Sequence, residues 1–202
     1  LNPQMLSNEI LNERIKNNFE IYKNRKSVKK LFFYGAGCGV DSTQERILKV
    51  FKSIFTNSEF DIKEDTYAAV YSAVDIGTPS IVNIIGTGSN CSYYDGKDVI
   101  QKVQSLGYVL MDYASGNYYG KYLIRAYYFN KMPEYLREEF AKNYDLSPNT
   151  IKNKLYREEN PNTYLAGFAK FLIDNKSNEY FKEIIFKGLE RFIDYQILQY
   201  DN

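Results

Sequence analysis

The sequence predicts an α/β fold with a largely helical C-terminal half. In the first eighty residues, short apolar runs alternate with segments in which apolar residues recur at a helical period, which is typical of an α/β layer. From Asn117 to the end, the helical period continues without strand-like runs. We therefore expect two domains, residues 1–79 and residues 80–202, the second with a hairpin followed by a helical region.

The elements of the first half follow from this spacing and from glycine-rich boundaries. Apolar residues behind Ser7 recur at a helical period, and the apolar run 31–34 ends at the glycine-rich segment Gly35–Gly39. Asp95 and Gly96 form a strong hairpin signal between two short strands. The predicted helices are 8–22, 42–55 and 66–74, and the predicted strands are 31–34, 60–63, 80–85, 90–94 and 98–103.

The second half reads as five successive helices. Pro133, Pro148 and Pro161 each fall near a helix start, where a missing backbone N–H costs no intrahelical hydrogen bond. The predicted helices are 118–130, 134–144, 147–156, 164–174 and 179–199.

Composition limits the partners and the compartment. Lys and Arg total 26 against 25 Asp and Glu, so no net field draws the chain to nucleic acid or to an anionic membrane. No apolar run approaches the roughly 20 residues of a membrane helix, and the first ten residues lack the apolar core of a signal peptide. The two cysteines are too few for a disulfide framework. We expect a cytoplasmic protein that binds neither nucleic acid nor membranes.

The complete absence of histidine narrows the chemistry further. It excludes Ser-His-Asp and Cys-His catalysis as well as histidine-bound metals. A proton acceptor in this chain must therefore be a carboxylate, a lysine, a tyrosine or a cysteine. The 20 tyrosines could stack on RNA bases, but tyrosines scattered through amphipathic segments are more often core and rim residues.

Two glycine-rich turns are candidate ligand sites. Gly35–Gly39 lies between a strand and a helix, but its third glycine comes one residue too early for a dinucleotide-binding motif, and Val40 stands at the required place. This segment is either part of a nucleotide fold or a tight turn. Gly86, Thr87, Gly88 and Ser89 separate two strands, and their backbone N–H groups and hydroxyls could cradle phosphate oxygens or form a simple hairpin turn.

Two aspartates stand at strand-to-helix boundaries. Asp65 follows an apolar strand and precedes a helix, so it could accept a proton from a hydroxyl group or cap the helix. Asp112 lies between an apolar run and the helix-start signal Ser115-Gly116. It could hydrogen-bond a polyol or cap the helix that follows.

The order of these motifs resembles the N-acetylglucosamine kinase and BadF/BadG-type ATPase family. The matching pieces are Asp65 after a strand, the Gly86–Cys91 segment, Leu106-Gly107 and Asp112-x-x-Ser115-Gly116. The resemblance implies an actin-type, ribonuclease H-like two-lobe ATPase fold, incomplete in this sequence. It also implies ATP and Mg²⁺ as cofactors and a sugar as substrate.

The resemblance carries roles to individual residues. It implies that Asp65 is the catalytic base, and that Gly86, Thr87, Gly88 and Ser89 contact the ATP phosphates. The sugar-binding residues that it implies are Gly37, Asn90, Gly107 and Asp112. Where the family has Gly-Asp-Glu-Gly-Ser, this chain has Met-Asp-Tyr-Ala-Ser at residues 111–115, so one acidic group and two glycines are replaced.

The resulting hypothesis is an ATP-dependent kinase that phosphorylates N-acetylglucosamine or a related amino sugar. Its partners would be the sugar and ATP, and the sequence is compatible with a homodimer. Two alternatives remain open. One is an ATPase module that activates a partner enzyme, although related activators bind an iron–sulfur cluster through cysteines and only Cys38 and Cys91 are present. The other is a sugar-binding remnant without catalysis, suggested by Tyr113 and Ala114.

The strand count predicts that neighbouring parts of the protein lie outside this sequence. No strand precedes Leu31 to complete a sheet, and the family's first phosphate loop and its adenosine segment are missing. We expect Asp65 and Asp112 to face one cavity that is open where those segments would close it.

Overall fold

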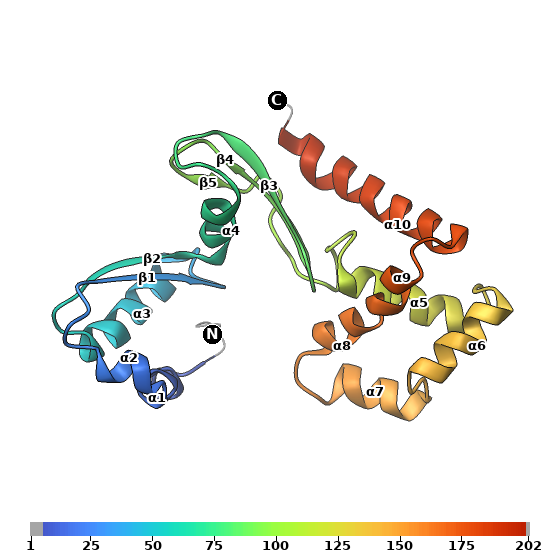
Figure 1. Ribbon diagram of the computed structural model, residues 1–202, viewed down its shortest axis with the longest axis horizontal. Helices are drawn as coiled ribbons and strands as arrows, with labels where there is room; N and C mark the ends of the chain where they lie inside the picture. Colours follow the sequence, from blue (N-terminus) through green and yellow to red (C-terminus); the bar gives the residue numbers. More distant parts are fainter. Residues whose placement is uncertain (1–5, 201–202) are drawn as a thin grey trace. The chain divides into compact units, whose positions relative to one another are not determined.

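The computed structural model describes residues 6–200, which fold into two compact units (Figure 1). The first unit comprises residues up to Ser80 together with 94–99, and the second comprises 81–93 and the chain from Ile100 onwards. Segment 94–99, expected in the second domain, therefore belongs to the first unit. None of the helices in residues 6–200 combines the length and the apolar composition that a membrane span requires.

The first unit is built on a parallel pair of strands. β1 (Lys30–Gly35) and β2 (Glu59–Glu64) pair with Lys30 opposite Glu59 and Gly35 opposite Glu64. A parallel pair needs a crossover, and α3 (Asp41–Ile54) provides it. Because the strands run in the same direction, their carboxyl ends meet at one edge of this small sheet, directly before the glycine-rich turn and before α4.

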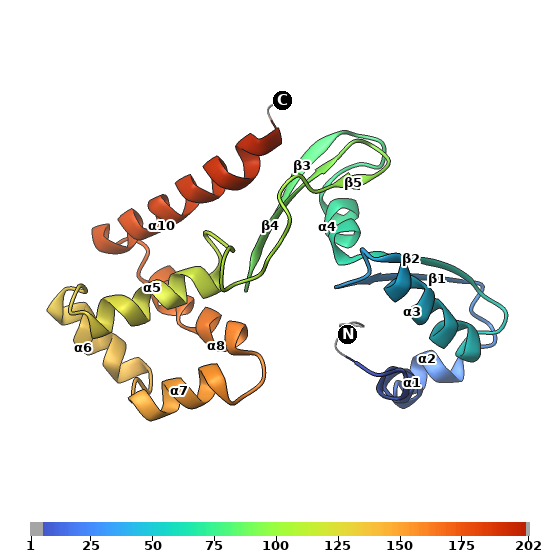
Figure 2. The same cartoon turned by 180° about the vertical axis from the view of Figure 1, so that it is seen from behind.

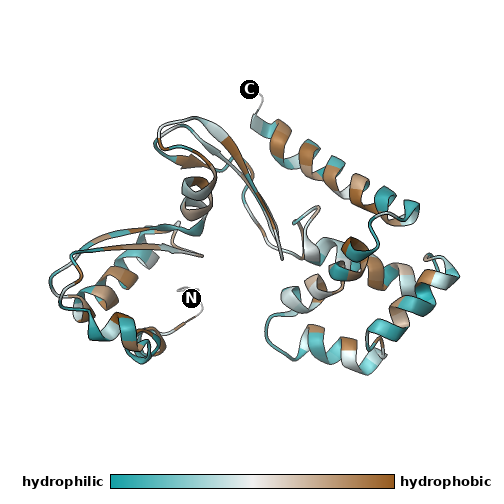
Figure 3. Cartoon of the chain, viewed as in Figure 1, coloured by the Kyte–Doolittle hydropathy of each residue, from teal (hydrophilic) through white to brown (hydrophobic). Residues whose placement is uncertain are grey.

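The core of the first unit lies between β1, β2 and the helices α1 (Asn8–Asn17) and α3. Figure 3 shows the apolar stripe of α3 turned to one side of the helix. The predicted helix 8–22 is interrupted at Asn18, whose Oδ1 accepts from the N–H of Ile21 at 3.2 Å and caps a separate helix, α2 (Phe19–Lys23). The buried core residues are Leu11, Ile15, Ile47, Val50, Phe51, Ile54 and Phe55.

Helix α4 (Asp65–Ala73) starts where β2 ends and packs against β1 and β2. The Tyr71 hydroxyl lies 3.0 Å from Lys63 Nζ, and the Tyr71 ring meets Tyr94 edge-on at 6.3 Å. The N–H of Val99 donates to the hydroxyl of Tyr67 at 3.2 Å. These contacts explain why segment 94–99 belongs to the first unit.

A second sheet has the strand order β3-β4-β5, formed by β3 (Ser80–Ile85), β4 (Ser89–Tyr94) and β5 (Val99–Ile100). The predicted hairpin turn is confirmed, since the Asp95 side chain accepts from the N–H groups of Lys97 and Asp98 at 2.8 and 2.7 Å. The predicted strand 98–103 is too long. The N–H of Lys102 donates to the hydroxyl of Tyr200 at 3.0 Å, which ends the strand early.

The second unit packs its helices around α5 (Gly116–Tyr128), which contacts α8, α9 and α10 (Figure 2). The predicted helix 164–174 is two helices that meet at Phe168. The last predicted helix is α-helical only to Phe192, and then widens into a π-helical turn over Ile193–Ile197. The other bounds are α6 (Glu134–Asn143), α7 (Pro148–Tyr156), α8 (Pro161–Gly167), α9 (Ala169–Asp174) and α10 (Glu179–Phe192).

Gly120 allows α5 and α8 to approach closely, and its replacement should destabilise the second unit. A Cβ at Gly120 would lie 1.8 Å from the carbonyl oxygen of Leu165. We expect Gly120→Ala to lower the free energy of unfolding by about 3 kcal/mol, which is near the upper limit of the usual cost of overpacking a core site. Urea unfolding followed by circular dichroism measures this loss.

Gly167→Ala is the matched control for Gly120→Ala. Gly167 ends the same helix α8, and a Cβ there would meet no atom within 4 Å. Alanine is also the better helix former, so this variant should be at least as stable as the parent, by up to about 1 kcal/mol. Equal stabilities of the two variants would contradict the α5–α8 contact.

Candidate active site

The first part of the candidate site is the tight turn after β1. Gly37 has φ +80°, a conformation that favours glycine, and the N–H of Cys38 donates to the carbonyl of Gly35 at 3.0 Å. Gln44 of α3 donates its Nε2 to the carbonyl of Cys38 at 2.7 Å. The turn is therefore tied to the first turn of α3, which fixes its position at the carboxyl edge of the strands.

A cavity of about 370 Å³ opens at this edge. The carboxylate of Glu64 enters it beside Gly39, where a Cβ would lie 3.0 Å from Oε2 of Glu64. Gly39 thus leaves room for a carboxylate that any larger residue would displace. The lining residues are Cys38, Gly39, Gln44, Ile62, Lys63, Glu64, Tyr67 and Val99.

Asp65 is the first residue of α4 and is exposed to solvent. The hypothesis that Asp65 caps the helix is wrong, because the N-cap position belongs to Glu64, which makes no capping hydrogen bond. Asp65 therefore stands in the first turn of α4, at the positive end of the helix dipole. Its role as a catalytic base stays a prediction.

Glu64 was not among the residues predicted from the sequence. It lines the cavity, whereas Asp65 is not among the lining residues. Burial, and next the neighbouring charge of Asp65, raise the pKa of the Glu64 carboxyl group. Two adjacent acidic residues at the end of a strand could have pointed to Glu64. Only the second of them, Asp65, matched the family motif.

The raised pKa of Glu64 predicts a pH-dependent stability. The folded protein holds the Glu64 proton to higher pH than the unfolded chain, so stability falls as the pH rises from the unfolded pKa through the folded one. Glu64→Gln removes this loss. We therefore expect the Tm of Glu64→Gln to exceed that of the parent at pH 7 and the difference to vanish below about pH 4.

Glu45→Gln, on the exposed side of α3, is the control for the pH experiment. Thermal unfolding of both variants and the parent from pH 3.5 to 8 gives the comparison. A Tm advantage of Glu64→Gln that persisted unchanged at the acidic end would refute the linkage.

The second part of the candidate site is the turn that joins β3 and β4, residues Gly86 to Gly88. The N–H of Gly86 donates to the carbonyl of Gly88 at 2.8 Å and closes the turn. The carbonyls of Gly86 and Thr87 accept from the N–H groups of Gly116 and Asn117 at 2.8 and 3.1 Å. The turn is therefore fixed to the start of α5.

The segment 112–115 forms a second turn beside the first. Asp112 and Ala114 have φ of +66° and +61°, a left-handed conformation that aspartate tolerates and alanine rarely adopts. The hypothesis that Asp112 caps α5 is wrong, because the cap is Ser115, whose Oγ accepts from the N–H of Tyr118 at 3.2 Å. Ala114 keeps the backbone shape even though a glycine is replaced there.

Asp112 is 7% exposed, and its carboxylate lies next to Gly88 of the first turn. A Cβ at Gly88 would lie 2.7 Å from Oδ2 of Asp112, so a larger residue there would displace this carboxylate. Oδ2 also accepts from Nδ2 of Asn117 at 3.0 Å. Asn117 is a second residue that the sequence analysis missed, since nothing in its neighbourhood along the chain marks it.

The remaining predicted residues of the second unit surround these turns. The hydroxyl of Ser89 donates to the carbonyl of Tyr113 at 2.7 Å, so it serves an internal contact. Asn90 follows in β4 and is half-buried. Gly107 has φ +81°, and its carbonyl accepts from the N–H groups of Leu110 and Met111, which shapes the approach to Asp112.

The predicted site residues are divided between the two units. Gly37 and Asp65 belong to the first unit, and Gly86–Ser89, Asn90, Gly107 and Asp112 belong to the second. A cavity shared by Asp65 and Asp112 stays a prediction. Within residues 6–200, no three Asp, Glu or Cys side chains converge as metal ligands.

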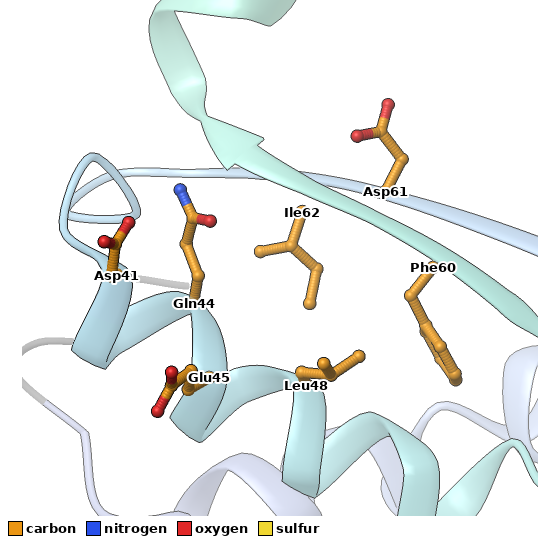
Figure 4. Close-up of a pocket in the computed structure, with 7 residues that line it drawn as sticks. All are labelled: Asp41, Gln44, Glu45, Leu48, Phe60, Asp61 and Ile62. Atoms are coloured by element: carbon orange, nitrogen blue, oxygen red, sulfur yellow. The ribbon is translucent and has the colours of Figure 1, made fainter.

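Another cavity, of about 420 Å³, lies between α3 and β2 and contains none of the motif residues (Figure 4). Leu48, Phe60 and Ile62 fill the space between the helix and the strand, while the Asp61 carboxylate points away from α3. The apolar side chains belong to the packing of the first unit, so this cavity is not part of the candidate site.

Comparison with known proteins decides the fold family. No model of a protein family matches the sequence, and a search of the curated proteins finds no match. Among solved structures, a putative N-acetylglucosamine kinase from Porphyromonas gingivalis matches with a TM-score of 0.88 and 26% sequence identity. The match covers 100% of this chain and 71% of that chain. This chain is similar in fold to that kinase over its whole length.

The family resemblance drawn from the motifs is therefore confirmed, together with the mixed α/β class of the fold. The match extends over the whole chain and therefore includes every predicted site residue. The actin-type arrangement of two lobes stays a prediction.

Proposed function

We propose that this chain carries the phosphate- and sugar-binding part of a cytoplasmic ATP-dependent kinase that acts on N-acetylglucosamine or a related amino sugar. The similarity to a kinase structure supports the reaction class. The observation that carries the proposal is the contact between the glycine turn and Asp112. This contact brings backbone N–H groups that can bind phosphate oxygens next to a carboxylate that can accept hydrogen bonds from sugar hydroxyls.

In the proposed reaction, a sugar hydroxyl oxygen attacks the γ-phosphorus of ATP, ADP leaves, and the hydroxyl proton passes to the carboxylate of Asp65. Asp112 accepts hydrogen bonds from other sugar hydroxyls. The N–H groups of Thr87 and Gly88, which donate to no carbonyl of the described residues, are free to bind phosphate oxygens. Mg²⁺ bound to the nucleotide phosphates would neutralise part of their charge.

The burial of both cysteines disfavours the activator alternative. Cys38 and Cys91 are each 0% exposed and lie in different units. Burial, the largest influence on each thiol, raises both pKa values, that of Cys91 to about 11, so neither is a ready thiolate ligand for a cluster at a subunit interface.

A coupled assay of ADP release tests the proposal. The full-length protein is incubated with ATP, Mg²⁺ and N-acetylglucosamine, N-acetylmannosamine or glucose in turn. We expect it to release ADP only with an N-acetylated sugar, and we expect residues 1–202 alone not to turn over ATP, because they hold only part of the phosphate site. ATP hydrolysis without any sugar would favour the activator, and sugar binding in calorimetry without ADP release would favour the non-catalytic remnant.

A further inference from the structure

Asn117 is a completely buried polar residue that contacts both turns of the candidate site. It is 0% exposed and is the second residue of α5. Its Nδ2 lies 2.6 Å from the carbonyl oxygen of Thr87 and 3.0 Å from Oδ2 of Asp112. A carbonyl and a carboxylate oxygen both act as acceptors, so the network fixes the orientation of the amide.

The backbone of the same residue strengthens the link. The N–H of Asn117 also donates to the carbonyl of Thr87 at 3.1 Å, so this oxygen receives two hydrogen bonds from one residue. The N–H of Gly116 binds the carbonyl of Gly86 at 2.8 Å, and Ser89 binds Tyr113 from the other side. Among the described residues, Asn117 is the side chain that joins the glycine turn to the carboxylate of Asp112.

A packing role alone does not account for an asparagine at this position. Its Oδ1 is buried without a hydrogen-bond partner among the described residues, which destabilises the folded state. An apolar side chain of similar volume would avoid this cost. The polar side chain is explained if its donor group has a task at the site.

We propose that Asn117 is a positioning residue that holds the Asp112 carboxylate and the Gly86–Ser89 turn in one fixed geometry. The identity of the two ligands rests on the proposed kinase function: Asp112 holds the sugar and the turn holds the ATP phosphates. Joined in this way, the two subsites are energetically coupled, so the sugar increases the affinity for the nucleotide and the nucleotide increases the affinity for the sugar by the same factor.

Hydrogen exchange tests the positioning role without any ligand. In Asn117→Ala, the amides of Gly86 and Gly116 should exchange about tenfold faster than in the parent, because the Gly86 bond closes the turn that Asn117 holds and the Gly116 bond joins this turn to α5. Asn117→Asp keeps the shape but places an acceptor against two acceptors, and it should give the same result if the alanine variant does not fold. Unchanged exchange at both amides in a folded variant would overturn the proposal.

Asn175→Ala is the matched control. Asn175 also donates its Nδ2 to a carbonyl oxygen, that of Phe171 at 3.0 Å, but at the end of α9, outside the two turns. It should leave the exchange of Gly86 and Gly116 unchanged. If these amides also exchanged faster in the control, the effect of Asn117→Ala would reflect general destabilisation, and the proposal would be overturned.

Ligand binding tests the coupling itself. The Kd for N-acetylglucosamine is measured with and without a non-hydrolysable ATP analogue. We expect the analogue to lower this Kd at least about fivefold in the parent and in Asn175→Ala, and to have no effect in Asn117→Ala. The kcat of Asn117→Ala should fall roughly 10²-fold, more than either KM rises, because misplaced reactants react slowly even when bound.

The outcomes separate this inference from the proposed function. Full coupling or an unchanged kcat in Asn117→Ala would overturn the positioning role while leaving the kinase function intact. A parent protein that neither binds nor phosphorylates any sugar would refute the proposed function, and the exchange of Gly86 and Gly116 would then decide on the role of Asn117 by itself.

Discussion

Asp65→Asn should reduce sugar phosphorylation by roughly 10²–10⁴-fold while nucleotide affinity stays nearly unchanged. The substitution keeps the shape of the side chain and removes the proton acceptor. Because Asp65 is exposed and does not cap α4, its replacement should leave the stability of the first unit almost intact. Steady-state kinetics and calorimetry with an ATP analogue measure the two effects.

Glu64→Gln is the comparison that makes this experiment decisive. Both residues are acidic and adjacent at the end of β2, but the structure places only Glu64 in the lining of the cavity. We expect Glu64→Gln to keep most of the activity. A larger loss in Glu64→Gln than in Asp65→Asn would assign the base to Glu64 and would show that the family motif is shifted by one residue here.

Gly88→Val should lower kcat/KM by about 10²-fold or more, because it weakens the binding of both ATP and the sugar. The sequence alone predicts a loss of ATP affinity with a much smaller change in sugar binding, because a side chain in the turn keeps the backbone from the phosphates. The structure adds a second effect. A Cβ at Gly88 would lie 2.7 Å from Oδ2 of Asp112, so the carboxylate must move and the affinity for the sugar should fall as well.

Gly86→Ala separates the two effects of Gly88→Val. A Cβ at Gly86 would meet no atom within 4 Å, so this variant changes the approach of a ligand without an internal collision. We expect it to weaken ATP binding alone, as measured by calorimetry with each ligand. Unaltered sugar affinity in Gly88→Val would argue against the close contact between the turn and Asp112.

The secondary structure was predictable where local signals mark its boundaries. The strands 31–34, 60–63 and 80–85 are confirmed within a residue at each end, because glycine and charged residues bound each apolar run. The break at Phe168 was not predictable, because it accompanies the close approach of α8 to Gly120 of a distant helix. The helical period itself continues through the break.

The site was predictable to the extent that its residues belong to contiguous motifs. Gly88 and Asp112 were expected in one site, and the structure brings them into contact. Asn117 was not predicted, because its partner Thr87 is 30 residues away and no feature of the local sequence reports that contact. Glu64 was missed because its cavity is lined by residues from the turn after β1, α3, β2 and α4. The spacing of acidic residues in the sequence does not show that these elements meet around Glu64.

The contacts of Tyr200 have a consequence for the order of folding. Its hydroxyl lies 3.0 Å from the carbonyl oxygen of Cys91 and 3.3 Å from that of Ile100, and it accepts from the N–H of Lys102. These partners precede it by about a hundred residues in the chain. During synthesis, the polar groups at the end of β5 lack this hydroxyl partner until Tyr200 has left the ribosome, so this sheet closes about a hundred residues after its own strands have been made.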